Sequence, residues 1–178
     1  EAAEMFNKVY KMVFASEGSS FGYSVNIIGL YKTAGTIKCK GRKMYYDESR
    51  FTSWEDGITA HKVDKKKKTI SISRFDDERK DPQRAKFKYD INNFDCSYKA
   101  EGDFYMITGK VKNSSFFGVR EFQAKVWKKN LYPVSISIKV AFMRTTIQIN
   151  NFKMLSIADS EFVFPKNKFP NYKVTDYR

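Results

Sequence analysis

The 178-residue chain contains few chain-breaking residues and few reactive ones: four prolines, nine glycines, two cysteines and one histidine. No stretch approaches the roughly 18 uninterrupted apolar residues that a membrane-spanning helix needs, so we expect no membrane anchor in this chain. Scarce proline and glycine, together with 42% hydrophobic and 16% aromatic residues, are typical of a strand-rich globular protein and exclude a disordered one. The length fits a single domain over residues 1–178.

The scarcity of reactive groups argues against an enzyme. His61 is the only histidine, and without a carboxylate or nucleophile committed to it we interpret it as a surface or strand residue. Nucleophile-elbow, metalloprotease and phosphate-loop motifs are all missing. The carboxylates Asp76, Asp77 and Glu78 are interpreted as a solvated loop. We therefore predict no catalytic residue and no cofactor.

The two cysteines, Cys39 and Cys96, match no zinc or redox spacing, so we predict no metal site. In an oxidising compartment they would be able to form one disulfide. The alternative is that each is a separate small core residue. The sequence leaves both possibilities open.

Acidic residues are in the minority, with 20 against 33 lysines and arginines, which gives a net charge of +13. Such a charge attracts nucleic acid, anionic membranes and acidic ligands without specificity, and it also aids solubility. Lysines alternate with apolar residues along strands, as in Ile37-Lys38-Cys39-Lys40, so we predict no specific nucleic-acid partner. The run Lys65 to Lys68 is interpreted as a solvated hairpin turn, with an anionic headgroup contact as the alternative.

Residue periodicity predicts one helix followed by many strands. Apolar residues from Ala2 to Val13 recur every three or four positions, which predicts an amphipathic helix over 2–14. Beyond it the period becomes two, and short turns imply antiparallel neighbours. The expected strands are 21–27, 35–45, 58–63, 69–75, 104–111, 119–127, 134–142 and 146–152. Asp81-Pro82 predicts the start of a short helix that continues to Tyr89.

The last seventeen residues combine strand alternation, two prolines and a polar end. Phe162 and Phe164 alternate as one face of a strand that Pro165 stops, because proline removes a backbone donor. Phe169-Pro170 then turns the chain into a short final extended piece, which ends in Asp176-Tyr177-Arg178.

These segments follow one another in an order that resembles a known family. The order is Gly35-Thr36-Ile37 with Lys40-Gly41, Trp54-Glu55-Asp56-Gly57, Asp81-Pro82, Pro133-Val134-Ser135-Ile136, Thr146-Ile147-Gln148-Ile149 with Asn151-Phe152, and the C-terminal tail. Nearly the whole chain resembles the outer-membrane lipoprotein carrier proteins (LolA-like), in the branch that ends in a Lys-aromatic-Pro turn and Asp-x-Arg.

The resemblance implies a mainly β (α+β) fold, in which a strongly curved antiparallel sheet forms a half-open barrel and the N-terminal helix and short helices lid its concave side. It implies a cavity for apolar ligands. The expected lining residues are Phe21, Tyr23, Val25, Ile27, Ile37, Ile70, Ile72, Phe87, Phe104, Met106, Ile136, Ile138, Val140, Ile147 and Ile149. Alternation gives the direction of these side chains but leaves open whether the interior is filled or hollow.

Two pairs of neighbouring residues depart from the family pattern or stay unassigned. His61 and Lys62 stand where the family more often has an aromatic pair, which predicts a more polar wall. Lys43 lies near the position of a basic residue that tethers the lid in classical carriers, but neither Lys43 nor Arg42 is assigned that role.

The function implied by the resemblance is that of a monomeric periplasmic carrier, or chaperone, whose signal peptide has been removed. It would bind the acyl chains of lipoproteins, or another lipid, for transfer to the outer membrane, with partners at the inner and outer membranes. The alternative is a non-transporting module of the cell envelope that senses lipid or lipoprotein. Fold alone does not separate these two functions.

Overall fold

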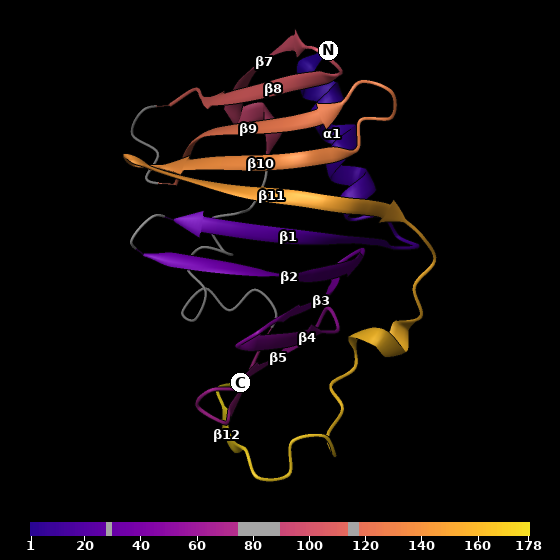
Figure 1. Cartoon of the computed structure of the whole chain (residues 1–178), viewed down its shortest axis with the longest axis vertical. Coiled ribbons are helices and arrows are strands. Elements are labelled where there is room, and N and C mark those ends of the chain that lie inside the picture. The colour runs from indigo at the N-terminus through magenta and orange to yellow at the C-terminus, as the bar shows by residue number, and fades with distance from the viewer. Residues whose placement is uncertain (28–29, 75–89, 114–117) are drawn as a thin grey trace.

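The computed structural model describes residues 1–27, 30–74, 90–113 and 118–178, and these form one twelve-stranded sheet with one α-helix and two short 3-10 helices (Figure 1). This part of the chain is mainly β, as the sequence predicts. The strands are β1 (Ser19–Ile27), β2 (Tyr31–Lys40), β3 (Lys43–Glu48), β4 (Phe51–Glu55), β5 (Thr59–Asp64), β6 (Thr69–Arg74), β7 (Phe94–Glu101), β8 (Phe104–Val111), β9 (Val119–Trp127), β10 (Pro133–Val140), β11 (Met143–Met154) and β12 (Lys173–Asp176).

The strand order is β12-β6-β5-β4-β3-β2-β1-β11-β10-β9-β8-β7. Strands β1 to β6 form one antiparallel meander and β7 to β11 form another, and the antiparallel pairing of β1 with β11 joins the two. Strand β12 adds to β6 in parallel. Because β12 and β7 are the outer strands of the described sheet, the sheet is open and does not close into a barrel.

The helix α1 (Ala2–Val13) covers one face of the second meander. Its apolar stripe includes Phe6 and Val9, and the ring of Phe6 lies 4.2 Å from the ring of Phe122 in β9. At the end of the helix, Val13 joins a second cluster with Phe21 and Tyr23 of β1. The predicted helix over 2–14 is therefore confirmed, and it ends one residue earlier.

The pairing register defines two faces of the sheet, which we call face A and face B. Face A is the face under α1, and one row of paired residues across it is Tyr98, Ile107, Ala124, Ile136, Ile147, Val25 and Thr33. Face B is the opposite face, and one row across it is Ser20, Lys38, Tyr45, Trp54, His61 and Ile72. Because side chains alternate along a strand, neighbours in sequence lie on opposite faces.

In the C-terminal segment, residues 155–178, the part that precedes β12 covers face B of the first meander. Trp54 packs against Phe164 and Phe169, with ring centroids 5.5 and 5.9 Å apart. The 3-10 helix η2 (Asp159–Phe162) is held to β2 and β3 by Lys40 and Lys43, each of which has its Nζ 2.9 Å from the Asp159 carboxylate. Lys43 and Lys40 hold the pKa of that carboxyl at about 2.

Several predicted elements differ from the structure. The strand predicted over 35–45 is two strands, because Gly41 takes a left-handed φ of +56° and turns the chain. Strands β4 and β7 were not predicted. Phe162 and Phe164 share no strand, since Phe162 ends η2. The short lidding helix expected through Tyr89 lies outside the described residues.

The cysteines are free in this fold, so the disulfide alternative is wrong. Cys39 is buried in β2, whereas Cys96 is half-buried in β7, and β1 and β8 to β11 lie between these two strands. Each is a separate small packed residue.

Candidate functional site

Face A carries an apolar area that α1 does not bury. It lies on β1, β11 and β10, where Val25 pairs with Ile147 and Ile147 pairs with Ile136. We call this area the distal field; its residues are Val25, Ile27, Ile136, Ile138, Val140, Met143 and Ile147. All seven lie on face A by register.

Burial decreases along these strands away from the end of α1. On β1, Phe21 and Tyr23 are buried, whereas Val25 and Ile27 are only half-buried. On β10 and β11, the paired Val140 and Met143 are each 43% exposed. The helix end therefore meets a packed core, and the opposite strand ends present accessible aliphatic surface.

Ten of the predicted lining residues share face A, as expected. They are Phe21, Tyr23, Val25, Ile27, Ile37, Ile136, Ile138, Val140, Ile147 and Ile149. Among them, Phe21, Tyr23 and Ile149 are buried in the cluster beneath the helix end. Phe87 lies outside the described residues.

Four predicted lining residues lie on face B, so the expectation of one common inward face is wrong. Ile70 and Ile72 pack with Trp54 under the C-terminal segment. Phe104 and Met106 lie on the outer side of β8, where the ring of Phe104 is 4.2 Å from that of Trp127. The physical reason is register, because Tyr105 and Ile107 are the β8 residues that pair across to face A.

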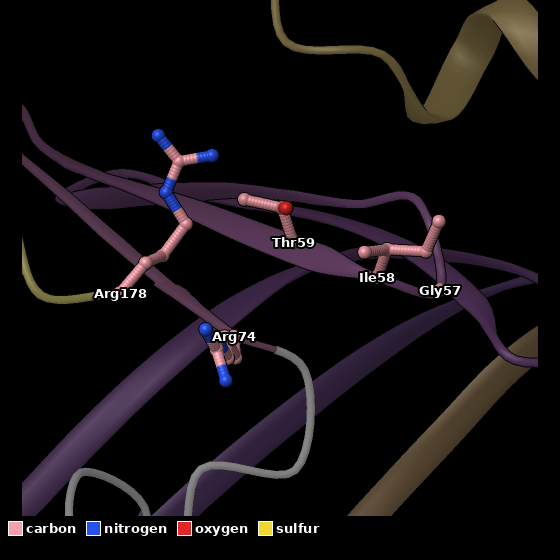
Figure 2. A pocket seen from close by; sticks show the side chains of 5 residues that line it. All are labelled: Gly57, Ile58, Thr59, Arg74 and Arg178. Carbon is pink, nitrogen blue, oxygen red and sulfur yellow. The ribbon is translucent and has the colours of Figure 1, made fainter.

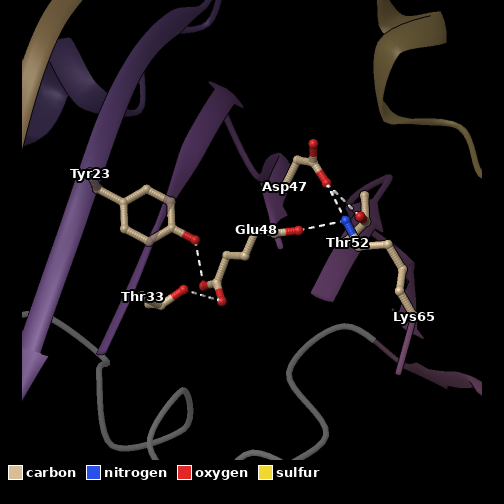
Figure 3. A network of polar contacts seen from close by, with 6 residues as sticks. All are labelled: Tyr23, Thr33, Asp47, Glu48, Thr52 and Lys65. Atoms are coloured by element: carbon tan, nitrogen blue, oxygen red, sulfur yellow. Dashed lines mark hydrogen bonds and ion pairs between the residues drawn. The ribbon is translucent and has the colours of Figure 1, made fainter. Parts of the chain in front are cut away.

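A carboxylate borders the distal field on face A. Glu48 of β3 accepts hydrogen bonds from Tyr23 at 2.5 Å, Thr33 at 2.9 Å and Tyr31 at 3.1 Å, and Figure 3 shows the first two. Thr33 pairs with Val25, so this polar group lies next to the aliphatic surface. Burial and the Glu48 hydrogen bond raise the pKa of Tyr23, which keeps the phenol protonated as a donor.

A second cluster of polar side chains lies on face B, on the opposite side of the sheet from Glu48. Asp47 accepts from Thr52 at 2.6 Å and from Lys65 at 3.2 Å, and the same Lys65 ammonium donates to the backbone carbonyl of Glu48 (Figure 3). These bonds tie the turn after β5 to β3. They fix the strand that presents the Glu48 carboxylate on face A.

An open hollow of about 560 Å³ lies beside the turn between β4 and β5. Figure 2 shows its lining residues, Gly57, Ile58, Thr59, Arg74 and Arg178. The Arg178 guanidinium donates to both carboxylate oxygens of Asp176, at 2.6 to 3.2 Å. This arrangement offers positive charge but no nucleophile or general base.

His61 belongs to β5 and is stacked on Phe164, with ring centroids 4.5 Å apart and an angle of 3° between the planes. Its interpretation as a strand residue is confirmed. Burial lowers the pKa of the imidazole. The neutral ring therefore serves as a packing surface for the C-terminal segment.

Metal centres and membrane-spanning helices do not occur in the part of the chain that the structure describes. Within residues 1–27, 30–74, 90–113 and 118–178, no three His, Cys, Asp or Glu side chains are placed to hold a metal ion. In the same residues, no helix has the length and hydropathy needed to cross a bilayer.

Sequence reasoning missed two residues of the candidate site, Glu48 and Met143. Met143 follows directly on the predicted strand 134–142, and its pairing with Val140 becomes visible only in the hairpin. Glu48 carries no sequence motif. Its hydroxyl donors come from β1 and β2, so only the sheet register identifies it.

No protein-family model and no curated protein matches this chain. Among solved structures, the fold is similar to an uncharacterized conserved protein from Thermus thermophilus, with a TM-score of 0.64, 9% identity and 99% of each chain covered. It is also similar to the Pseudomonas aeruginosa MucA/MucB complex structure, with a TM-score of 0.51, 9% identity, and 93% of this chain and 61% of that chain covered. A LolA superfamily protein from Nitrosomonas europaea matches with a TM-score of 0.46, 7% identity, and 93% and 98% of the two chains covered.

Proposed function

We propose that this protein is a non-enzymatic binding protein that holds the acyl chains of a lipid or lipoprotein against the distal field on face A. The observation that carries the proposal is the decrease in burial from the helix end to Val140 and Met143, which leaves aliphatic side chains accessible on a defined face. Burial of each methylene of an acyl chain is worth about 0.8 kcal/mol, so such a surface binds acyl chains without directed polar contacts.

The proposal includes a finer assignment, a periplasmic carrier that moves lipoproteins to the outer membrane. What supports this assignment is the resemblance to the lipoprotein carrier proteins in the order of segments from Gly35-Thr36-Ile37 to the C-terminal Asp-x-Arg. Donor and acceptor vesicles with a labelled lipoprotein would test it, because a carrier transfers the label between them. A sensor binds the same ligand without transfer.

The binding test compares an acylated lipopeptide with the identical peptide that lacks its acyl chains. Isothermal calorimetry is the suitable measurement, because Trp54 and Trp127 both lie on face B and tryptophan fluorescence would report poorly on face A. We expect saturable binding of the acylated peptide alone. Equal binding of both peptides, or binding of neither, would contradict the proposal.

A matched pair of valine variants locates the site. Val140→Ser removes an exposed aliphatic group from the distal field, whereas Val163→Ser removes one from the C-terminal segment, where Val163 is 60% exposed. We expect the first change to weaken lipopeptide binding by about tenfold and the second to leave it unchanged. The same effect for both variants would place the ligand elsewhere.

A further inference from the structure

Two hairpin turns at one end of the sheet present large apolar side chains to solvent. Leu30, in the turn between β1 and β2, is 72% exposed, and Phe142, in the turn between β10 and β11, is 89% exposed. Because β1 pairs with β11, these are turns of neighbouring hairpins, and Figure 1 shows the end of β1 and the end of β10 on the same side of the sheet. We call this end the apolar rim; its residues are Leu30, Tyr31, Val140, Phe142 and Met143.

The backbone of the second turn holds Phe142 outward. Val140 pairs with Met143, so only Ala141 and Phe142 form the turn. Ala141 takes a φ of +53°, a left-handed conformation that residues with a Cβ rarely adopt. The tip is therefore a tight two-residue turn whose aromatic side chain has no strand beside it to pack against.

The apolar rim is continuous with the distal field. Val140 and Met143 belong to both, and each is 43% exposed. On β2, Tyr31 is 45% exposed and donates to Glu48 at the border of the field. An acyl chain on the distal field would thus have one end at the rim.

Cationic side chains lie next to the two turns that carry Leu30 and Phe142. Lys139 and Arg144 form a cross-strand pair directly behind the second tip, and Lys32 lies two residues after Leu30. Arg144 also forms an ion pair with Glu121 at 2.5 Å, so one carboxylate lies beside these two cations. Apolar tips backed by cations match a bilayer surface that contains anionic lipids, where the tips enter the acyl region and the cations stay at the headgroups.

We propose that the apolar rim docks this protein on a bilayer that contains anionic lipids, with Phe142 and Leu30 inserted and the distal field opening at the membrane surface. This inference rests on the proposed acyl-chain function and deepens it. On a docked protein, the distal field would receive its acyl chain directly from the bilayer.

The test is co-sedimentation of the full chain with vesicles of phosphatidylcholine, and with vesicles that also contain phosphatidylglycerol, at low and high salt. We expect binding to the anionic vesicles that weakens with salt. Phe142→Ser and Leu30→Ser should each weaken it by about tenfold. Ile58→Ser is the matched control, since Ile58 is 77% exposed in the turn at the opposite end of the strands, and should bind as the wild type does.

A second readout detects insertion directly. Phe142→Trp should give a blue-shifted emission on anionic vesicles when the spectrum of the wild type, with Trp54 and Trp127 on face B, is subtracted. Vesicle binding by Phe142→Ser equal to the wild type, an equal loss in Ile58→Ser, or no vesicle binding by the wild type would overturn the proposal. The last result would favour a protein partner for the rim.

The two proposals fail in different experiments. If Phe142→Ser binds vesicles normally while the acylated lipopeptide still binds, only the rim proposal is wrong. If the wild type does not bind the lipopeptide but vesicle binding still requires Phe142, the acyl-chain proposal is wrong, and with it the delivery of a ligand to the distal field, while the docking of the rim stands.

Discussion

His61 lies flat against Phe164 beneath the C-terminal segment, and burial lowers its pKa from the ordinary 6.5. Asp56 and Asp176 oppose this shift, whereas Arg178 and Lys166 add to it. Because the folded state binds the proton more weakly than the unfolded state, the contribution of His61 to stability is fully present above pH 6.5 and is lost as the pH falls toward the folded pKa.

Exchange of His61 for a residue that does not titrate tests this reasoning. We expect the melting temperature of the wild type to fall between about pH 7.5 and about pH 5.5 by more than that of His61→Phe, which keeps an aromatic ring against Phe164. Differential scanning calorimetry at both pH values measures the difference. Equal pH dependence in the two proteins would mean that His61 contributes little.

At the scale of single elements, the C-terminal segment is held by aromatic packing more than by charge. The carboxylates of its ion pairs with β2 and β3, Glu161 and Asp159, are 51% and 65% exposed, so salt screens these pairs. Trp54 is only 7% exposed because Phe164 and Phe169 cover it. The tryptophan is therefore a natural reporter of whether the segment is in place.

Removal of one covering ring should be visible in that reporter. We expect Phe169→Ala to lower the free energy of unfolding by about 1–3 kcal/mol, less than the loss of a fully buried ring because Phe169 is only half-buried. Tryptophan emission should shift to longer wavelength, because water reaches Trp54. Val163→Ala, in the same segment but 60% exposed, is the control and should change neither quantity. An unshifted spectrum for Phe169→Ala would show that the remaining rings suffice to exclude water.

The sequence predicted the strands and their antiparallel neighbours better than it predicted which face of the sheet each residue occupies. Clear period-two runs, such as residues 134–142, became strands at nearly the expected bounds. β4 was missed because both of its faces are covered, so that Thr52, Ser53, Trp54 and Glu55 are all buried without any alternation of polarity. β7 does alternate, with Phe94 and Cys96 on face A, so the period-two pattern that predicts a strand is present in its sequence.

The two faces of the sheet were harder to assign, for a physical reason. Residues Phe104 to Ile107 of β8 are apolar at four successive positions, so alternation does not say which pair faces α1. Ile70 and Ile72 alternate clearly, but the side chains that cover them come from Phe164 and Phe169, about ninety positions later in the sequence. Only the folded arrangement shows that this cover lies on face B.

For the molecule as a whole, the pairing of β1 with β11 decides whether there is one sheet or two. It joins the meanders through pairs such as Tyr23 with Ile149 and is flanked on face A by the cluster that includes Val13. The outer strands β7 and β12 have a neighbour on one side only. Stability should therefore be highest along the junction and lowest at the two edges.

Native-state hydrogen exchange measures this distribution residue by residue. We expect the slowest amides in β1 and β11, exchanging at a free energy near that of global unfolding, and the fastest strand amides in β12, whose four residues are all exposed. Early exchange in β1, with β8 and β9 still protected, would show that the two meanders unfold separately.

The same junction has a consequence for synthesis of the protein. Strand β1 pairs on one side with β2, which follows it directly, but on its other side it needs residues 143–154. The helix α1 needs residues 104–127 to bury its apolar stripe. During synthesis, α1 therefore stays uncovered and one edge of β1 stays unpaired until these later strands have been made. Loop closure over such separations is slow, so folding is largely a post-translational event, and the nascent chain is the stage most exposed to aggregation and most dependent on chaperones.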